Sequence, residues 1–149
     1  MDYEIKELTK EDLEKDKNGF LETLTNLSEV KNLNLDELKN IFGIIKSHGV
    51  IVYIAKTSDG KIIGTAKLLI EQKFTHGGGK VGHLEDVAVR KGYEGNGIAT
   101  KIINEIIFRA KKEKCYKLIL DCNDNNLGFY KKFGFHLHEH SMRVDFEIL

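Results

Sequence analysis

Apolar residues along this chain follow two spacings, one typical of strands and the other of helices. Alternating positions and short apolar runs predict five strands, over residues 2–8, 50–56, 61–74, 81–89 and 116–122. The sequence "SDG" at 58–60 predicts a hairpin turn between the second and third of them. The C-terminal residues 135–149 are expected to be extended again, with a break near 139–141.

Apolar residues at helical spacing predict four helices between these strands. Thr9 begins the first helix with Asp12 at the capping-box position, and a break is expected near Asn18-Gly19. Asn34 caps the second helix, and residues 125–134 form a short last one. The third helix carries one apolar face, made of Ile98, Ile102, Ile103, Ile106, Ile107 and Ala110.

The order of these elements indicates an α/β chain with a mixed sheet, in a single domain over residues 1–149. Lys and Arg number 23, as do Asp and Glu, so no overall basic field favours nucleic acid or an anionic membrane. No apolar run approaches the roughly 18 residues of a membrane span. The charged N-terminus resembles neither a signal nor a transit peptide, which predicts a cytoplasmic protein. Cys115 and Cys122, about 20 Å apart in an extended segment, cannot pair with each other.

A glycine-containing loop, "GYEGNGIA" at 92–99, precedes the third helix. Gly95 and Gly97 carry no side chains, so backbone N–H groups can approach a ligand closely. The helix from Ile98 leaves its first amides unpaired, and its dipole favours negative charge there. A pyrophosphate suits this position, although the spacing matches neither a Walker loop nor a dinucleotide fingerprint. The residues alone also allow an ordinary strand-to-helix turn.

Two acids, Glu85 and Asp86, interrupt the strand that leads into this loop. Regular pleating would point adjacent side chains to opposite faces, whereas a bulge would bring both toward one cleft. Carboxylates beside an ammonium group can hold it and accept its proton. The alternative is an exposed acidic pair at a strand end.

The residues Glu94-Gly95-Asn96-Gly97-Ile98-Ala99 resemble the signature of the GNAT acyltransferase superfamily. That signature reads Arg or Gln, two residues, Gly, one residue, then Gly or Ala. Glu94 departs from it. An acid there is expected to leave the anion-binding backbone amides of the loop in place but to weaken CoA binding. The stretches "GHLEDVAV", "CYKLILDC" and "NNLGFYKKFGF" are similar to the glucosamine 6-phosphate N-acetyltransferase branch, and the similarity covers residues 60–142 well.

This resemblance implies a GNAT fold, with a central, mostly antiparallel sheet flanked by helices, and acetyl-CoA as co-substrate without a metal. It implies that backbone amides of Val87, Ala88 and Val89 face the acetyl group and the pantetheine arm. Tyr130 would protonate the departing thiolate, although a tyrosine on such a helix is otherwise a core residue. The remaining cofactor contacts would come from Gly95, Asn96, Gly97, Ile98, Ala99, Thr100, Asn126, Tyr130 and Lys131.

For the acceptor, the resemblance implies that Glu85 and Asp86 bind and deprotonate the amine of glucosamine 6-phosphate. Asp121 would contact the sugar, cap the following helix, or do both. The phosphate and sugar would be held by Ser28, Lys73, His76 and Arg143, with Tyr116 and Lys117 contributed by the partner subunit of a homodimer. The alternating His136, His138 and His140 suggest a solvated or interface face rather than a metal site, because no fourth ligand is fixed by spacing.

The resulting hypothesis is direct attack of the amine on acetyl-CoA in a ternary complex. The product, N-acetylglucosamine 6-phosphate, would feed UDP-N-acetylglucosamine synthesis. Cys122 lacks an evident base, so no acyl-enzyme is expected. One alternative is a GNAT enzyme that acetylates a protein N-terminus, a lysine or a polyamine. Others are a non-catalytic CoA-binding regulatory module and a phosphate-binding domain that uses the glycine loop alone.

Overall fold

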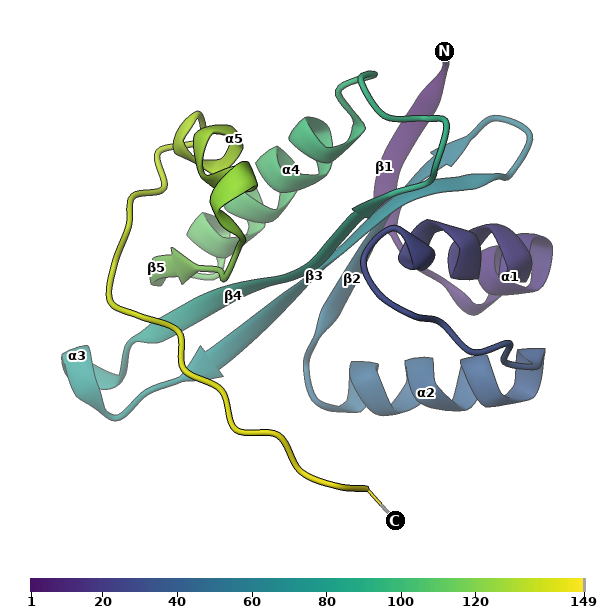
Figure 1. Cartoon of the computed structure of the whole chain (residues 1–149). Coiled ribbons are helices and arrows are strands. Elements are labelled where there is room, and N and C mark those ends of the chain that lie inside the picture. The colour runs from purple at the N-terminus through teal and green to yellow at the C-terminus, as the bar shows by residue number, and fades with distance from the viewer. Residues whose placement is uncertain (149) are drawn as a thin grey trace.

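The computed structural model describes residues 1–148, which form a five-stranded sheet with helices on both faces (Figure 1). The strands follow chain order in the sheet, β1-β2-β3-β4-β5, antiparallel except for the parallel pair β4-β5. Their bounds are Tyr3–Glu7, Ile51–Thr57, Ile62–Gln72, Lys80–Val89 and Cys115–Ile119. The predicted mixed sheet with mostly antiparallel pairing is therefore confirmed.

The helices connect these strands much as the apolar spacing predicts. α1 and α2 follow β1, α3 is a single turn between β3 and β4, and α4 leads into β5. A 3₁₀ turn, η1, runs directly into the short last helix, α5. Their bounds are Lys10–Thr25, Leu35–Ser47, Thr75–Gly78, Ile98–Lys112, Asp124–Asn126 and Leu127–Lys131. No helix within residues 1–148 is long and apolar enough to cross a membrane.

The apolar core lies in two layers, one on each face of the sheet. On one face α4 packs through Ile102, Ile103 and Ile106, each fully buried, against β2, β3 and β4. On the other face α1 and α2 pack over β2 and the start of β3. Each fully buried aliphatic side chain contributes about 1.5–3 kcal/mol. The start of α4 lies tight against β3, because a Cβ at Gly64 would stand 2.6 Å from the Ile98 side chain.

The expected break within α1 is present, but it lies at Asp16 (φ −141°, ψ 51°) rather than at Asn18-Gly19. The Asp16 carboxylate accepts hydrogen bonds from Gly19 N–H at 3.3 Å and Ile62 N–H at 2.7 Å. It fills the space that a side chain at residue 19 would need, since a Cβ there would lie 2.0 Å from a carboxylate oxygen. The Asp16 carboxylate therefore stabilises the kink, and Gly19 leaves the space that this carboxylate needs.

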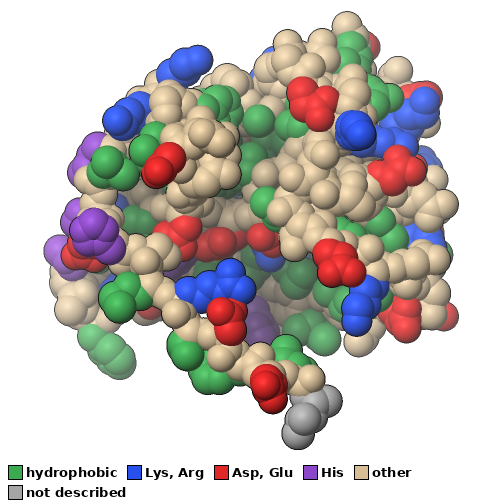
Figure 2. Space-filling view, in the orientation of Figure 1, with side chains coloured by type: hydrophobic (Ala, Val, Ile, Leu, Met, Phe, Trp, Pro, Cys, Tyr) green, Lys and Arg blue, Asp and Glu red, His purple; other side chains and the backbone are tan. Residues whose placement is uncertain are grey.

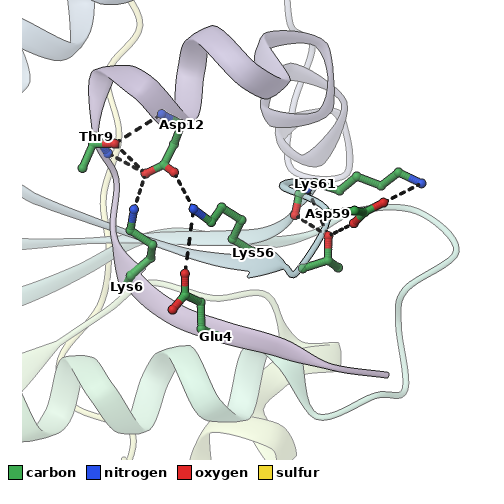
Figure 3. A network of polar contacts seen from close by, with 8 residues as sticks. Glu4, Lys6, Thr9, Asp12, Lys56, Asp59 and Lys61 are labelled. Atoms are coloured by element: carbon green, nitrogen blue, oxygen red, sulfur yellow. Dashed lines mark hydrogen bonds and ion pairs between the residues drawn. The ribbon is translucent and has the colours of Figure 1, made fainter.

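The start of α1 is held by a buried ionic cluster around Asp12 (Figure 3). Asp12 completes the predicted capping box with Thr9, and its carboxylate also pairs with Lys6 at 2.8 Å and Lys56 at 3.0 Å. Burial by itself raises the pKa of this carboxyl. Hydrogen bonds from the two lysines and from Thr9 outweigh that effect and hold the pKa well below its usual range. The cluster ties β1, α1 and β2 together.

The C-terminal segment forms no strand within residues 132–148, in contrast to the extended strand that its apolar alternation suggests. The predicted break is present, since Glu139 adopts a left-handed conformation with φ 55°. Beyond it every second side chain is apolar and exposed: Met142, Val144, Phe146 and Ile148. Regular strand structure needs a neighbouring strand, and within residues 1–148 this segment pairs with none.

Candidate active site

At the two acids of β4 the structure has a bulge, one of the two arrangements that the sequence left open. Asp86 has φ 53°, and the pairing of β3 with β4 slips by one residue between Thr65↔Ala88 and Lys67↔Glu85. A non-glycine residue in this left-handed region costs about 1–2 kcal/mol, so the surrounding structure must compensate. Bulges of this kind redirect a side chain at a functional site.

The bulge places both carboxylates on the same face of the sheet. Glu85 lies directly opposite Lys67 in the antiparallel register, and directly opposite side chains share a face. The Asp86 carboxylate contacts the Lys67 ammonium at 2.6 Å, which puts Asp86 on that face too. Lys67 pairs in turn with Val52, a residue of the core beneath α1 and α2. Both acids therefore lie on the α1/α2 side of the sheet.

A hollow opens beside this acidic pair, where β4 and β5 stop pairing. The parallel ladder ends at His83↔Ile119, so the β4 edge beyond it has no neighbouring strand within residues 1–148. The hollow has a volume of about 750 Å³, and residues 134–141 form part of its lining. Figure 2 shows acidic side chains gathered in the depression at the centre of this face. Residues 87–89 lie on this length of β4, although none of them lines the hollow.

Five of the predicted site residues line this hollow in a single chain: Glu85, Lys117, Asp121, Tyr130 and Lys131. They come from β4, β5, the turn after β5, and α5. Asp121 does not act as a helix cap, because the N-cap of η1 is Asn123. The hollow therefore brings acids, cations and a phenol from four segments of sequence to one surface.

Tyr130 stands at the wall of the hollow in an aromatic cluster. Its ring meets Phe129 edge-on at 5.1 Å and Phe135 at 6.0 Å between centroids. Burial raises the pKa of the Tyr130 hydroxyl, and the nearby Cys122 adds to the effect. The phenol is therefore protonated at neutral pH and serves as a hydrogen-bond donor or an acid.

The glycine loop between β4 and α4 presents bare backbone at the other end of the β4 edge. Gly95 and Gly97 have φ of 79° and 72°, and Gly97 is the N-cap of α4. The first bond of the helix runs from Lys101 N–H to Gly97 O at 3.1 Å, so the N–H groups of residues 98–100 have no partner inside the helix. A Cβ added at either glycine would meet nothing within 4 Å, so the space in front of the loop is open. Such an unpaired helix start favours the binding of an anion.

A model of the acetyltransferase (GNAT) family matches residues 11–135. The chain belongs to the GNAT acetyltransferase family. A protein of Trypanosoma brucei brucei named glucosamine 6-phosphate N-acetyltransferase is 38% identical over 146 residues, which cover 97% of each chain. One of the same name from Arabidopsis thaliana is 37% identical over 119 residues, covering 78% of this chain and 80% of the relative.

Solved GNAT structures agree with this assignment. An acetyltransferase of Trypanosoma brucei superposes with a TM-score of 0.90 at 38% identity, over 97% of this chain and all of that one. The glucosamine-6-phosphate N-acetyltransferase of Arabidopsis thaliana superposes with a TM-score of 0.91 at 31% identity, over 99% of this chain and all of that one. The predicted family, fold and enzyme class are confirmed.

Glu94, the departure from the GNAT signature, folds back onto its own loop. Its carboxylate accepts a hydrogen bond from Gly92 N–H at 2.7 Å and another from the Asn26 amide at 3.0 Å. The Asn26 amide also donates to Val89 O at 2.7 Å, so the end of α1 holds both sides of the loop. Backbone N–H groups of Glu94 itself and Gly92 lower the pKa of the Glu94 carboxyl. The Glu94 carboxylate is therefore ionised, and its hydrogen bonds are made to groups of the protein itself.

Several predicted residues of this GNAT domain lie outside the hollow. His76 in α3 stacks on Tyr116 of β5 with ring centroids 4.2 Å apart, and Lys73 pairs with Glu71 at 3.3 Å. Arg143 pairs with Asp145, its Nε 2.7 Å from the Asp145 carboxylate. Also outside the lining of the hollow are Ser28, in the exposed turn after α1, Asp86, on the Lys67 side of the bulge, and Asn126, exposed before α5.

Sequence reasoning missed three side chains that the GNAT fold brings to the site: Lys67, His83 and Asn26. His83 lines the hollow two residues before Glu85 and contacts the Glu71 carboxylate at 3.1 Å. That contact, followed by Lys73, lowers the pKa of Glu71. Strand alternation from Glu85 could have indicated His83, whereas Lys67 and Asn26 depend on strand register and on tertiary packing. Within residues 1–148, no three His, Cys, Asp or Glu side chains are grouped to hold a metal ion.

Proposed function

We propose that this enzyme transfers the acetyl group of acetyl-CoA to the amine of glucosamine 6-phosphate. The observation that carries the proposal is the left-handed Asp86, which turns two carboxylates to one face beside an open β4 edge and an anion-binding helix start. The relatives with this name at up to 38% identity over nearly the whole chain support the sugar phosphate as acceptor. We propose further that residues 1–149 act as one cytoplasmic domain.

The donor lies along the open edge of β4. The diphosphate of acetyl-CoA binds the N–H groups that start α4 and those of the loop at Gly95 and Gly97, with Asn96 and Ala99 beside them. The pantetheine arm runs along the amides of residues 87–89, which also receive the charge that develops on the thioester oxygen. Lys131, Asn126 and Thr100 complete the cofactor contacts. Coenzyme A supplies the activated thioester; the protein supplies position and charge.

The chemistry is a direct attack in a ternary complex. The acceptor ammonium gives one proton to Glu85, directly or through water, and the neutral nitrogen attacks the thioester carbon. The C–N bond forms and the C–S bond breaks. The second amine proton leaves by the same route, while the thiolate takes the hydroxyl proton of Tyr130, which regains it from solvent. Mass and charge balance as amide, free thiol and one proton that Glu85 releases to solvent.

A homodimer is part of this proposal. The exposed alternation from Met142 to Ile148 and the edge position of β5 both favour pairing with a second copy. In such an assembly the phosphate site is completed across the interface. One protomer supplies the His76–Tyr116 stack and Lys73, and the other members of the site are Lys117, Ser28 and Arg143. A protein that sediments as a monomer at micromolar concentration contradicts the shared site.

Thiol release from acetyl-CoA tests the acceptor. We expect kcat/KM for glucosamine 6-phosphate to exceed that for unphosphorylated glucosamine and for a lysine peptide by at least about 100-fold, because a phosphate site left empty loses several charge-assisted hydrogen bonds. A product of the mass of an N-acetylated sugar phosphate must accompany the thiol. Comparable rates with the peptide refute the sugar phosphate as the acceptor.

The hydrogen bonds of Glu94 to Gly92 and Asn26, here called the Glu94 brace, lead to a separate prediction for cofactor affinity. Glu94→Ala removes the acceptor for Gly92 N–H and Asn26, so the loop must be ordered again at each binding event, and we expect the Kd for CoA to rise about 5- to 10-fold. Glu94→Gln keeps one acceptor oxygen and should lose less. Calorimetry measures both, with Glu105→Ala on the exposed side of α4 as control. An unchanged Kd for Glu94→Ala shows that the brace is dispensable.

A further inference from the structure

Lys67 occupies a position beside the reacting centre. It stands on β3 directly opposite Glu85, and its ammonium lies 2.6 Å from the Asp86 carboxylate. About 29% of its side chain is exposed. Within residues 1–148 Glu85 makes no ion pair, so the lysine is bound to one acid of the pair and leaves the other free. The two adjacent acids are therefore chemically different.

The side chains around Lys67 strengthen the electrostatic effect of its charge on neighbouring groups. Val52 faces it from β2, and the α1 and α2 side chains over this part of the sheet are apolar, among them Leu24 and Ile45. On the β4 and β5 side Asp86 is the ion-pair partner of Lys67. The hollow beyond it is lined by further ionisable groups: His83, Glu85, Lys117, Asp121, Cys122, Asp124, Tyr130, Lys131, His136, His138, Glu139 and His140. Apolar neighbours lower the local dielectric, which strengthens the interaction between the lysine and any charge placed at Glu85.

An acceptor amine held by Glu85 is subject to two opposing demands. It binds best as an ammonium, but it attacks the thioester only as a neutral amine. Two unpaired carboxylates would favour the ammonium form and raise the amine's pKa. A fixed ammonium nearby has the opposite effect.

We propose that Lys67 is a positioning residue that neutralises Asp86 and thereby keeps the acceptor amine at Glu85 reactive at neutral pH. This inference rests on the proposed function, because it needs a primary amine as acceptor. The amine's proton goes to Glu85 and on to solvent, while Lys67 transfers no proton itself. The two acids therefore have different roles: Asp86 pairs with Lys67, and Glu85 binds the acceptor amine.

The pH profile of single-turnover acetyl transfer to glucosamine 6-phosphate, from about pH 6 to about pH 9, tests this role. For Lys67→Met we expect the midpoint of the rise in rate to move up by about one pH unit, with about 10-fold slower transfer at neutral pH and recovery at high pH. The KM for the sugar phosphate should stay constant or fall, since the ammonium form binds two carboxylates. Lys67→Arg keeps the charge and should retain most of the wild-type profile.

Controls separate this role from a merely structural one. Lys61→Met, in the exposed β2–β3 turn, should follow the wild-type profile, and Lys67→Gln serves if the methionine variant does not fold. A Lys67→Met profile that superimposes on the wild type, or a rate lowered equally at every pH, overturns the proposal. If the wild-type enzyme itself does not acetylate the sugar phosphate, the proposed acceptor fails, and the same profiles taken with the amine it does accept decide the role of Lys67.

Discussion

Tyr130→Phe is expected to slow acetyl transfer by about 10²- to 10⁴-fold while the Kd for CoA changes little, because the variant loses the acid for the leaving thiolate and nothing else. The ring itself stays in place, since its contacts with Phe129 and Phe135 are edge-on aromatic contacts that do not involve the hydroxyl. The raised pKa of the hydroxyl keeps the proton available over the whole neutral range. Rapid-quench measurement of acetyl transfer, with calorimetry for CoA, separates the two quantities.

Tyr53→Phe is the matched control for this experiment. Tyr53 is 3% exposed in the core beneath α4, and burial raises the pKa of its hydroxyl as it does for Tyr130. It lies on β2, away from the hollow, so its loss should leave the transfer rate unchanged. If Tyr130→Phe transfers acetyl within about three-fold of the wild type, the thiolate takes its proton from another donor. A non-catalytic CoA-binding module would show no transfer in either protein.

The fold was predictable from the sequence wherever the determinant is local. Ile102, Ile103 and Ile106 mark the buried face of α4 by their spacing alone, and the capping boxes at Thr9 and Asn34 fix two helix starts. The kink at Asp16 was misplaced because its main partner, the N–H of Ile62, lies 46 residues away. The extended strand that the C-terminal alternation suggests is absent, because a strand needs a neighbour and within residues 1–148 this segment pairs with none.

The candidate site divides in the same way. The glycine loop and the acidic pair were found because their chemistry lies in adjacent residues, whereas the residues alone left open whether pleating or a bulge orients the two acids. Lys67 could not be predicted as a site residue, because only the strand register places this lysine opposite Glu85. The role of Glu94 was likewise hidden: its partner Asn26 lies 68 residues away, at the end of α1.

Asp12→Ala is expected to cost about 3 kcal/mol of folding free energy and to lower the Tm by roughly 6–12 °C. The substitution removes the Asp12 half of the capping box, which accepts from the Thr9 N–H, and both ion pairs of a carboxylate whose side chain is 3% exposed (Figure 3). It also leaves the ammonium of Lys56, 17% exposed, without its main partner. Because β1, α1 and β2 meet here, the loss should be seen in global unfolding by urea, and a cost below about 1 kcal/mol contradicts the cluster's importance.

The pH dependence of stability gives an independent measure of the same carboxylate. The folded-state pKa of Asp12 lies below the value of about 3.9 for an unfolded aspartate, so its contribution is complete above that pH and is lost as the pH falls toward the folded-state pKa. Asp12→Asn should therefore be less stable than the wild type at neutral pH, with a difference that shrinks below about pH 4. Glu4→Ala is the control: its carboxylate is 3.8 Å from Lys56 but 63% exposed, and such a surface pair contributes at most about 0.5 kcal/mol. A difference between wild type and Asp12→Asn that stays constant down to acid pH means that size and hydrogen bonding, rather than charge, hold the start of α1.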